Sequence, residues 1–190
     1  MSLLEIAGVA ISFLGIWLTA KRSMLCWSVN FLACALYFKL FLDVRLYADM
    51  VLQALFAAAI LYGWFQWARG RSDTGEVAVE PLRPARAWAG LAIGAIGAAV
   101  IGWGTSRYTD AALPWMDSGL SSFSLIAQYW TARRHAASWL LWIAVDTLYV
   151  GMFLFKELWL TAGLYAAMIA LAISGYRRWR QAQANLPAGT

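Results

Sequence analysis

Two long apolar stretches of this chain repeat each other at an offset of 112 residues, which limits the folds that it can adopt. The matched positions include Lys21 with Arg133, Arg22 with Arg134, Trp27 with Trp139, Leu36 with Leu148, Tyr37 with Tyr149, Phe41 with Phe153, Leu46 with Leu158 and Leu52 with Leu164. Both stretches close with Gly-x-x-x-Trp, at Gly63 to Trp67 and at Gly175 to Trp179. Chance similarity between helices rich in Leu, Ala and Trp is the alternative, and the paired basic residues argue against it. The repeat predicts two three-helix units, a layout typical of transporters.

The composition places these units in a lipid bilayer. The chain is 62% hydrophobic and only 13% charged, with a mean hydropathy of +0.61, so it has too few charges to cover a water-soluble globule. A helix of about 20 apolar residues spans the hydrocarbon. We therefore expect an all-α polytopic membrane protein with seven transmembrane helices, at residues 2–20, 24–42, 46–68, 87–103, 114–131, 136–155 and 157–176.

The basic residues predict how the helices are oriented. Eleven of the fifteen fall on the side reached after the first, third, fifth and seventh helices, which the positive-inside rule assigns to the cytoplasm. The N-terminus is then outside and the C-terminus is cytoplasmic. The same asymmetry accounts for the net charge of +5 without a nucleic-acid partner. An odd helix between the units makes the repeat parallel, a 3+1+3 arrangement of the kind found in sugar transporters of the SWEET type.

This layout divides the chain into five parts. Residues 1–68 form the first three-helix repeat, 69–86 a solvated cytoplasmic linker, 87–110 the linking transmembrane helix, 111–180 the second repeat and 181–190 a cytoplasmic tail. Small residues recur at four-residue intervals along the linking helix, from Gly90 to Gly102, which suits close packing against a neighbour.

Polar residues inside the spans are the candidate ligand contacts, because a charge in hydrocarbon is costly. Asp146 lies near the middle of its helix, where an isolated carboxylate should face a cavity or a partner, or else be protonated through desolvation. The alternative is a structural hydrogen bond to a neighbouring helix. Asp49 begins a helix, so capping explains it as well as ligand binding does. Gln53 and Gln128 can each donate and accept hydrogen bonds, and Ser124 lies one turn from Gln128 on the same face.

Aromatic residues at similar depth could hold a flat or cationic ring. These are Tyr37, Tyr62, Trp64, Trp67, Trp139, Trp142, Tyr149 and Tyr165. Aromatic residues also collect at bilayer interfaces, which is what we expect of Trp17, Trp103, Trp115, Trp159 and Trp179.

The remaining reactive side chains predict no enzyme, metal site or cofactor. Cys26 and Cys34 share one predicted helix, too far apart to bridge, and are expected to be ordinary core residues. His135 is the single histidine and is expected to be a solvated loop residue, whereas a catalytic site needs several convergent groups. A membrane scaffold that transports nothing is the other class left open.

Several segments resemble the PnuC family of nicotinamide riboside transporters. In the first half they are Leu46 to Gln53 and Tyr62 to Trp67; in the second, Trp139 to Asp146, Thr161 to Tyr165 and Gly175 to Trp179. The similarity implies a SWEET-like fold, assembly as a homotrimer and facilitated diffusion of a vitamin or nucleoside precursor across the bacterial inner membrane. It also implies a functional link to a cytoplasmic kinase, which phosphorylates the imported ligand and so traps it.

Carried over by position, the family's motifs imply ligand contacts at Gln53, Trp64, Trp67, Gln128, Trp142, Asp146 and Tyr149. The sequence departs from the family at two positions. Asn30 stands where a glycine is common, and Asp146 where an asparagine is common. A carboxylate favours a cationic ring, which suits nicotinamide riboside or thiamine, and riboflavin or a deoxynucleoside also stay open.

Overall fold

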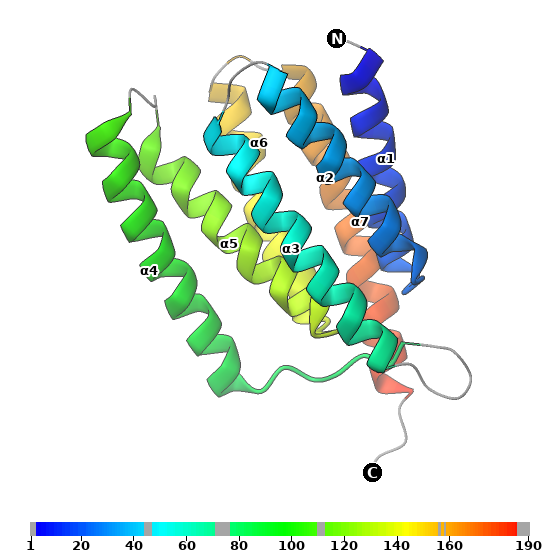
Figure 1. The fold of residues 1–190 in the computed structure, drawn as a ribbon. Coiled ribbons are helices and arrows are strands. Elements are labelled where there is room, and N and C mark those ends of the chain that lie inside the picture. The colour runs from blue at the N-terminus through cyan, green and yellow to red at the C-terminus, as the bar shows by residue number, and fades with distance from the viewer. Residues whose placement is uncertain are drawn as a thin grey trace.

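The computed structural model describes residues 3–43, 47–70, 77–109, 113–155, 157 and 159–185. These residues form seven α-helices (Figure 1). The helices are α1 (Leu3–Ala20), α2 (Leu25–Asp43), α3 (Tyr47–Arg69), α4 (Pro84–Tyr108), α5 (Pro114–Ala132), α6 (Ala137–Phe155) and α7 (Trp159–Ala184). The structure therefore confirms an all-helical protein with a helix in each expected segment.

Two helices run beyond their predicted ends. α4 starts at Pro84, three residues before the predicted start, because proline lacks the N–H group that a first-turn residue leaves unpaired in any case. α7 continues past Tyr176 to Ala184 through arginine and glutamine residues, so it includes the first part of the expected tail. Polar residues do not stop a helix once it leaves lipid.

Four described segments are long and apolar enough to cross a membrane: Met50–Arg69, Pro84–Tyr108, Ala137–Phe155 and Trp159–Ala184. α1 and α2 contain shorter apolar stretches, Ile6–Ala20 and Leu25–Leu40. α5 has a more polar surface, with Ser118, Ser122 and Ser124 buried inside the bundle. Ser118 and Ser122 face α4, where Ser118 lies 3.2 Å from the Thr105 hydroxyl and Ser122 donates to the Gly94 carbonyl at 2.8 Å.

The helices pack as two sets that close on each other. α2 packs against α1 and α3, and α6 packs against α5 and α7. The sets meet where α3 contacts α5 and where α7 contacts α1, the first and last helices of the chain (Figure 1). Within the described residues α4 packs against α5 alone and lies at the edge of the bundle (Figure 1).

The connections α1–α2 and α5–α6 have the same backbone geometry. Arg22 and Arg134 have positive φ angles of 58° and 63°. The N–H of Arg22 donates to the carbonyl of Thr19 at 3.0 Å, and that of Arg134 donates to Thr131 at 2.9 Å. Each of these four residues falls on its partner at the 112-residue offset, so the sequence repeat is also a repeat of local structure.

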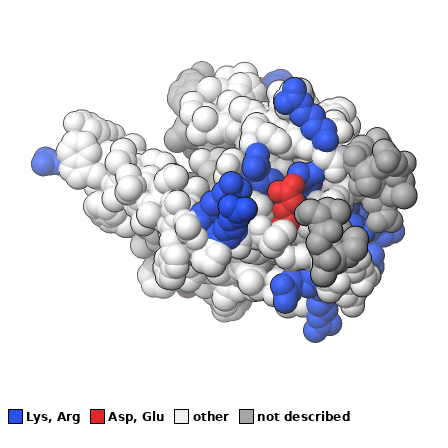
Figure 2. All heavy atoms as spheres, turned by 90° about the horizontal axis from the view of Figure 1, so that it is seen from below, with Lys and Arg blue, Asp and Glu red and all other residues white. Residues whose placement is uncertain are grey.

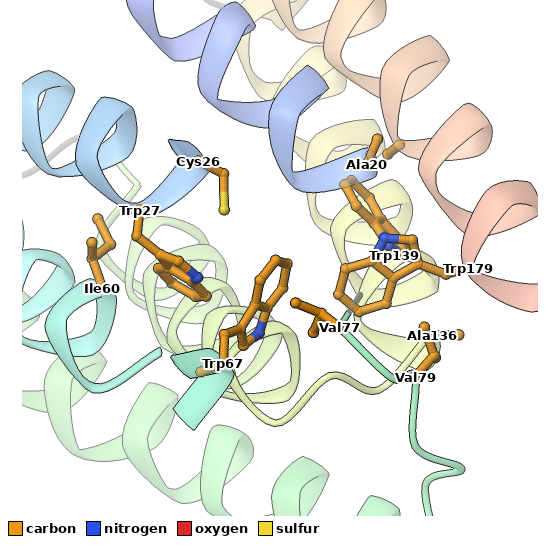
Figure 3. Packing of buried hydrophobic residues seen from close by; sticks show 12 residues of the cluster. Ala20, Cys26, Trp27, Ile60, Trp67, Val77, Val79, Ala136, Trp139 and Trp179 are labelled. Atoms are coloured by element: carbon orange, nitrogen blue, oxygen red, sulfur yellow. The ribbon is translucent and has the colours of Figure 1, made fainter. Parts of the chain in front are cut away.

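Four tryptophans form the centre of the core at the end of the bundle where these turns lie (Figure 3). Trp27 meets Trp67 edge-on with ring centroids 5.0 Å apart, and Trp139 meets Trp179 in the same way at 5.6 Å. The Nε1 of Trp67 donates to the Thr131 carbonyl at 3.1 Å. In the matching bond, 3.2 Å long, Trp179 donates to the Thr19 carbonyl. Each set of helices thus anchors its last helix on the turn of the other set.

The buried position of Trp179 corrects one expectation. Trp17, Trp103, Trp115 and Trp159 are exposed on the bundle surface, as residues of an interface belt would be. Trp179 was expected among them, yet none of its surface is exposed, because its ring fills the space between Trp67 and Trp139.

The glycine of each Gly-x-x-x-Trp motif makes room for a tryptophan ring. A Cβ atom at Gly63 would lie 2.0 Å from the Trp27 ring, and one at Gly175 would lie 2.7 Å from the Trp139 ring. Both distances are far below van der Waals contact, so only glycine fits. The motif therefore serves the packing of the tryptophan cluster.

The linker between α3 and α4 is packed where the structure describes it, contrary to the prediction of a solvated loop. Val77 and Val79 are 2% and 1% exposed and join the tryptophan cluster (Figure 3). Arg22 donates to the Val77 carbonyl at 3.0 Å, and Glu80 pairs with Arg134. Residues 77–80, which we call the strap, thereby contact the turns of both helix sets.

His135 was likewise expected to be solvated but is only 4% exposed. Its Nδ1 lies 3.0 Å from the Glu80 carbonyl, beneath the strap. Burial lowers the pKa of His135 below its ordinary value of 6.5, and Arg133 and Arg86 act in the same direction. Burial and the two arginines thus favour the neutral imidazole, whereas the Glu80 contact acts in the opposite direction.

Candidate functional site

A cavity of about 570 Å³ lies inside the bundle, with walls from α1, α2, α3, α5, α6 and α7. Its volume is within the range of pockets that hold small ligands. Nine of the predicted contact residues line it: Tyr37, Gln53, Ser124, Gln128, Trp139, Trp142, Asp146, Tyr149 and Tyr165. Side chains from both helix sets therefore converge on one internal site.

Four other candidates, Asp49, Tyr62, Trp64 and Trp67, are not among the described residues that line this cavity, and Tyr62 is 37% exposed. Trp64 is 40% exposed on the surface of the bundle, whereas Trp67 is fully buried in the tryptophan cluster. Trp67 follows the lining residue Ile60 by about two helical turns on the same face of α3, so it lies beyond the cavity, in the tryptophan cluster. The side chain of Asp49 lies outside the described residues.

Several lining residues escaped the sequence interpretation. Trp27, Asn30 and Cys34 come from α2, and Asp117 and Ser121 from α5; Ser12, Thr19 and Thr131 complete the polar part of this group. Cys34 was expected to be an ordinary core residue. The repeat contained a signal that could have found it, because Cys34 falls on Asp146 at the same offset that pairs Trp27 with Trp139.

The repeat relates the two sides of the cavity. The pairs that keep the same residue are Ser12 with Ser124, Thr19 with Thr131, Trp27 with Trp139 and Tyr37 with Tyr149. The pairs that differ are Ile16 with Gln128, Asn30 with Trp142, Cys34 with Asp146, Gln53 with Tyr165, Phe56 with Met168 and Ile60 with Ala172. The two sides of the cavity therefore share several side chains but differ in others, and the carboxylate of Asp146 lies on the side formed by the second helix set.

The cavity has an acidic character. Asp146 is 7% exposed, and Asp117 is its companion carboxylate in the wall. The described residues that line the cavity include no lysine, arginine or histidine. A buried carboxylate without a basic neighbour favours a cationic or hydrogen-bond-donating partner.

Two matched hydrogen bonds hold polar side chains in the wall. Asn30 donates to the Thr19 hydroxyl at 3.4 Å, and Trp142 donates to the Thr131 hydroxyl, also at 3.4 Å. The threonine hydroxyls donate in turn to the carbonyls of Gly15 and Ala127, one helical turn back. These bonds fix the orientation of two side chains that differ between the sides.

The indole Nε1 atoms of Trp27 and Trp139 are buried and have no hydrogen-bond partner among the described residues. Both tryptophans line the cavity. Because a buried N–H group without a partner is costly, these two donors suit a cavity that receives a polar molecule.

Aromatic rings form one wall of the cavity. Tyr149 lies 4.9 Å from Tyr165 and 5.8 Å from Phe153, measured between ring centroids. The Tyr149 and Phe153 rings are nearly parallel, with an interplanar angle of 13°. Such a wall offers flat apolar surface next to the carboxylate of Asp146.

Comparison with known families decides what kind of protein this is. Residues 2–181 match the family model described as nicotinamide mononucleotide transporter. The chain belongs to this family. It is 24% identical over 204 residues to the nicotinamide riboside transporter PnuC of Escherichia coli strain K12, an alignment that covers 94% of this chain and 85% of the relative. It is also 28% identical over 178 residues to the riboflavin/roseoflavin transporter RibM of Streptomyces davaonensis, covering 92% and 83% of the two chains.

A solved structure has the same fold. The crystal structure of the vitamin B3 transporter PnuC superimposes with a TM-score of 0.77 at 21% sequence identity, covering 96% of this chain and 83% of that chain. Family and fold together confirm the resemblance to PnuC that the sequence motifs indicated. The chain is thus a membrane transporter of a family that includes vitamin transporters, in agreement with the prediction that it is not an enzyme.

Proposed function

We propose that this transporter carries nicotinamide riboside into the cell by facilitated diffusion across the bacterial inner membrane. The observation that supports this ligand best is an aromatic wall, at Tyr149 and Tyr165, beside the carboxylate of Asp146, which has no basic neighbour among the described lining residues. A pyridinium ring can stack on the aromatic faces while its charge is balanced by the carboxylate. Gln53 and Gln128 are available to the ribose hydroxyls and the carboxamide.

Other vitamins are the alternatives. Thiamine is also a cation, so the same carboxylate favours it. Riboflavin is neutral, and it is named as the substrate of a relative that is 28% identical to this chain. A deoxynucleoside would use the amides and aromatic faces without needing Asp146. A scaffold without ligand would leave the acidic cavity without a use, because its polar groups are expensive to bury.

The architecture that we infer is a 3+1+3 arrangement of parallel repeats, with residues 1–68 and 111–180 as the repeats, 69–86 as the linker, 87–110 as the linking helix and 181–190 as the tail. The shared turns at Arg22 and Arg134 and the crossed tryptophan hydrogen bonds support it. The basic residues favour a cytoplasmic C-terminus and an external N-terminus. Lys and Arg also dominate the face at the lower end of the bundle (Figure 2).

The mechanism that follows is alternating access between the repeats. The cavity lies between the two helix sets, so rocking of one against the other would open it first to one side and then to the other. We further propose that the chain works as a homotrimer, with the exposed apolar surface of α4 available for assembly, and that a cytoplasmic kinase phosphorylates the ligand after entry. The added charge prevents its return through an acidic cavity.

Direct binding measurements test the ligand. The purified protein is titrated with nicotinamide riboside, thiamine, riboflavin and a deoxynucleoside by calorimetry in detergent. We expect one clear binder at micromolar affinity or tighter, with nicotinamide riboside favoured. If a different ligand binds and nicotinamide riboside does not, the vitamin is misassigned; if a folded protein binds none, the proposed substrate class is wrong.

Cys34 allows a test of the site itself, because it is half-buried in the cavity wall whereas the chain's other cysteine, Cys26, is fully buried. In a Cys26→Ala variant, a maleimide of small size should react with Cys34 alone. Bound ligand should slow that reaction, whereas a vitamin that does not bind should leave its rate unchanged. An unchanged rate with a saturating ligand would place binding elsewhere.

Uptake into liposomes tests the mode of transport. Facilitated diffusion predicts that ligand equilibrates across the membrane at the same rate with or without an imposed proton gradient. Within the described residues no histidine and no buried acid other than Asp146 is available in the cavity for a proton relay. Accumulation above the external concentration, driven by the gradient, would contradict this mode.

A further inference from the structure

A second cavity, of about 390 Å³, lies between the end of α1 and the last turns of α7. Its polar lining comes from Lys21, Arg22, Arg178, Gln181 and Asn185. It shares no lining residue with the large internal cavity. The proposed transport of a vitamin therefore does not use it.

This cavity is strongly cationic. Three of its lining residues carry a positive charge and two are amides, and no carboxylate belongs to its lining within the described part of the chain. Lys21 is held in place, with its Nζ 3.6 Å from the centre of the Trp17 ring. Arg22 is held from the other side by its bond to the Val77 carbonyl of the strap. Contacts within the folded chain therefore hold Lys21 and Arg22 at the cavity.

The matching place in the second helix set shows what such a group of charges accepts. Arg133 and Arg134 fall on Lys21 and Arg22 at the repeat offset. There the Glu80 carboxylate of the strap pairs with Arg134. In the first set Arg22 donates to the Val77 carbonyl of the strap, and Arg22 also lines the cavity together with Lys21 and Arg178.

We propose that this cavity binds a phosphate group, held by Lys21, Arg178 and Arg22, with Gln181 and Asn185 as further donors. Arginine and lysine are the side chains that bind phosphate oxygens most strongly, and amide groups add neutral hydrogen bonds. The phosphate can come from an anionic phospholipid headgroup or from a soluble ion. The position favours the lipid, because the neighbouring Trp17 is 42% exposed, as expected of a residue at the membrane surface.

Lipid titration of the full-length protein tests the proposal. The protein is purified in neutral detergent and its binding of phosphatidylglycerol and of phosphatidylcholine is measured by native mass spectrometry. The test variant is Lys21→Gln with Arg178→Gln. The matched control is Arg177→Gln with Arg180→Gln, which removes the same charge from two residues of α7 that lie outside the cavity lining. Circular dichroism establishes that both variants are folded.

We expect phosphatidylglycerol to bind more tightly than phosphatidylcholine, and its affinity to fall about tenfold or more in the test variant but little in the control. Competition by inorganic phosphate at millimolar concentration, with no preference for the lipid, would identify a soluble anion as the ligand of the same site. Equal losses in both variants would reduce the effect to general surface charge and overturn the proposal. So would the absence of any binding by either source of phosphate.

Discussion

We propose that Asp146 has the most influence on which molecule this transporter selects. Its place in the other helix set is taken by Cys34, so the carboxylate marks one side of an otherwise similar frame. A ligand with one charged end and one apolar end can then bind in only one orientation. The selectivity that we propose rests on this position, one of several at which the two sides of the cavity differ.

The Asp146→Asn variant tests that role. We expect the affinity for a cationic ligand to fall at least about tenfold, because a charged hydrogen bond becomes a neutral one. The affinity for a neutral ligand such as riboflavin should change much less. Calorimetry with both ligands measures the difference, and Asp146→Glu, which keeps the charge, serves as the control. Equal losses for both ligands would indicate a structural role.

His135 predicts a dependence of stability on pH. Because burial lowers its pKa in the folded protein, the unfolded chain binds a proton first as the pH falls below about 6.5. The stabilising contribution is therefore complete above that pH and is lost as the pH falls through the lowered pKa. Thermal unfolding between about pH 5 and 8 should show this decline, and His135→Asn should flatten it. An unchanged slope in the variant would assign the decline to other groups.

At the scale of elements, the best-defined contact joins a glycine of one helix to a tryptophan of another. Trp27 of α2 lies against Gly63 of α3, and Trp139 of α6 lies against Gly175 of α7. The rings are buried and packed on further tryptophans, so they have little room to move. These two contacts hold α2 to α3 and α6 to α7.

Replacing Gly63 by alanine should therefore destabilise the protein by about 1 to 3 kcal/mol, the usual cost of an overpacked core. Gly151→Ala is the matched control, since a Cβ atom there meets nothing within 4 Å. That control should be neutral or slightly stabilising, because alanine is the better helix former. Thermal or urea unfolding in detergent measures both variants. A neutral Gly63→Ala would mean that the ring of Trp27 can move aside.

The sequence predicted the elements better than their detailed contacts. Apolar length located a helix in all seven segments, whereas the ends of α4 and α7 were wrong because neither Pro84 nor the arginines after Tyr176 stop a helix. The strap was missed because its two valines stand among acidic residues and prolines, a composition typical of solvated loops. Their burial becomes visible only in the structure, where both valines pack against the tryptophan cluster.

The site was predictable to a similar extent. Polar and aromatic residues expected at mid-membrane depth line the cavity in nine cases, because burial of such groups in lipid is costly. Trp67 and Trp64 could not be placed in the same way, since an aromatic ring suits a core, a lipid face and a ligand equally well. Trp27 and Cys34 were within reach through the repeat, which relates each of them to a residue that was selected.

At the scale of the whole molecule, two hydrogen bonds join the helix sets across the tryptophan cluster. Trp67 of the first set donates to Thr131 of the second, and Trp179 of the second donates to Thr19 of the first. The tryptophan of each set therefore donates its hydrogen bond to a carbonyl of the other set, so neither bond can form before the two sets have packed together. The bundle is thus closed by a pair of matching anchors.

We expect Trp67→Phe and Trp179→Phe to lower the free energy of unfolding by similar amounts, about 1 kcal/mol or more each, because each removes one hydrogen bond and part of a buried ring. Unfolding in detergent measures both, and Trp88→Phe, at an exposed position on α4, is the control. A large loss in one variant with none in the other would contradict the equivalence of the two anchors.

The anchor at Trp179 also has a consequence for biosynthesis. Its acceptor, Thr19, lies at the end of the first helix, 160 residues earlier in the chain. Five further helices are therefore synthesised after α1 before α7 can pack against it. A nascent chain that stops short of Trp179 contains every described residue of the internal cavity's wall but lacks this anchor, so we expect the bundle to close only after Trp179 has been synthesised.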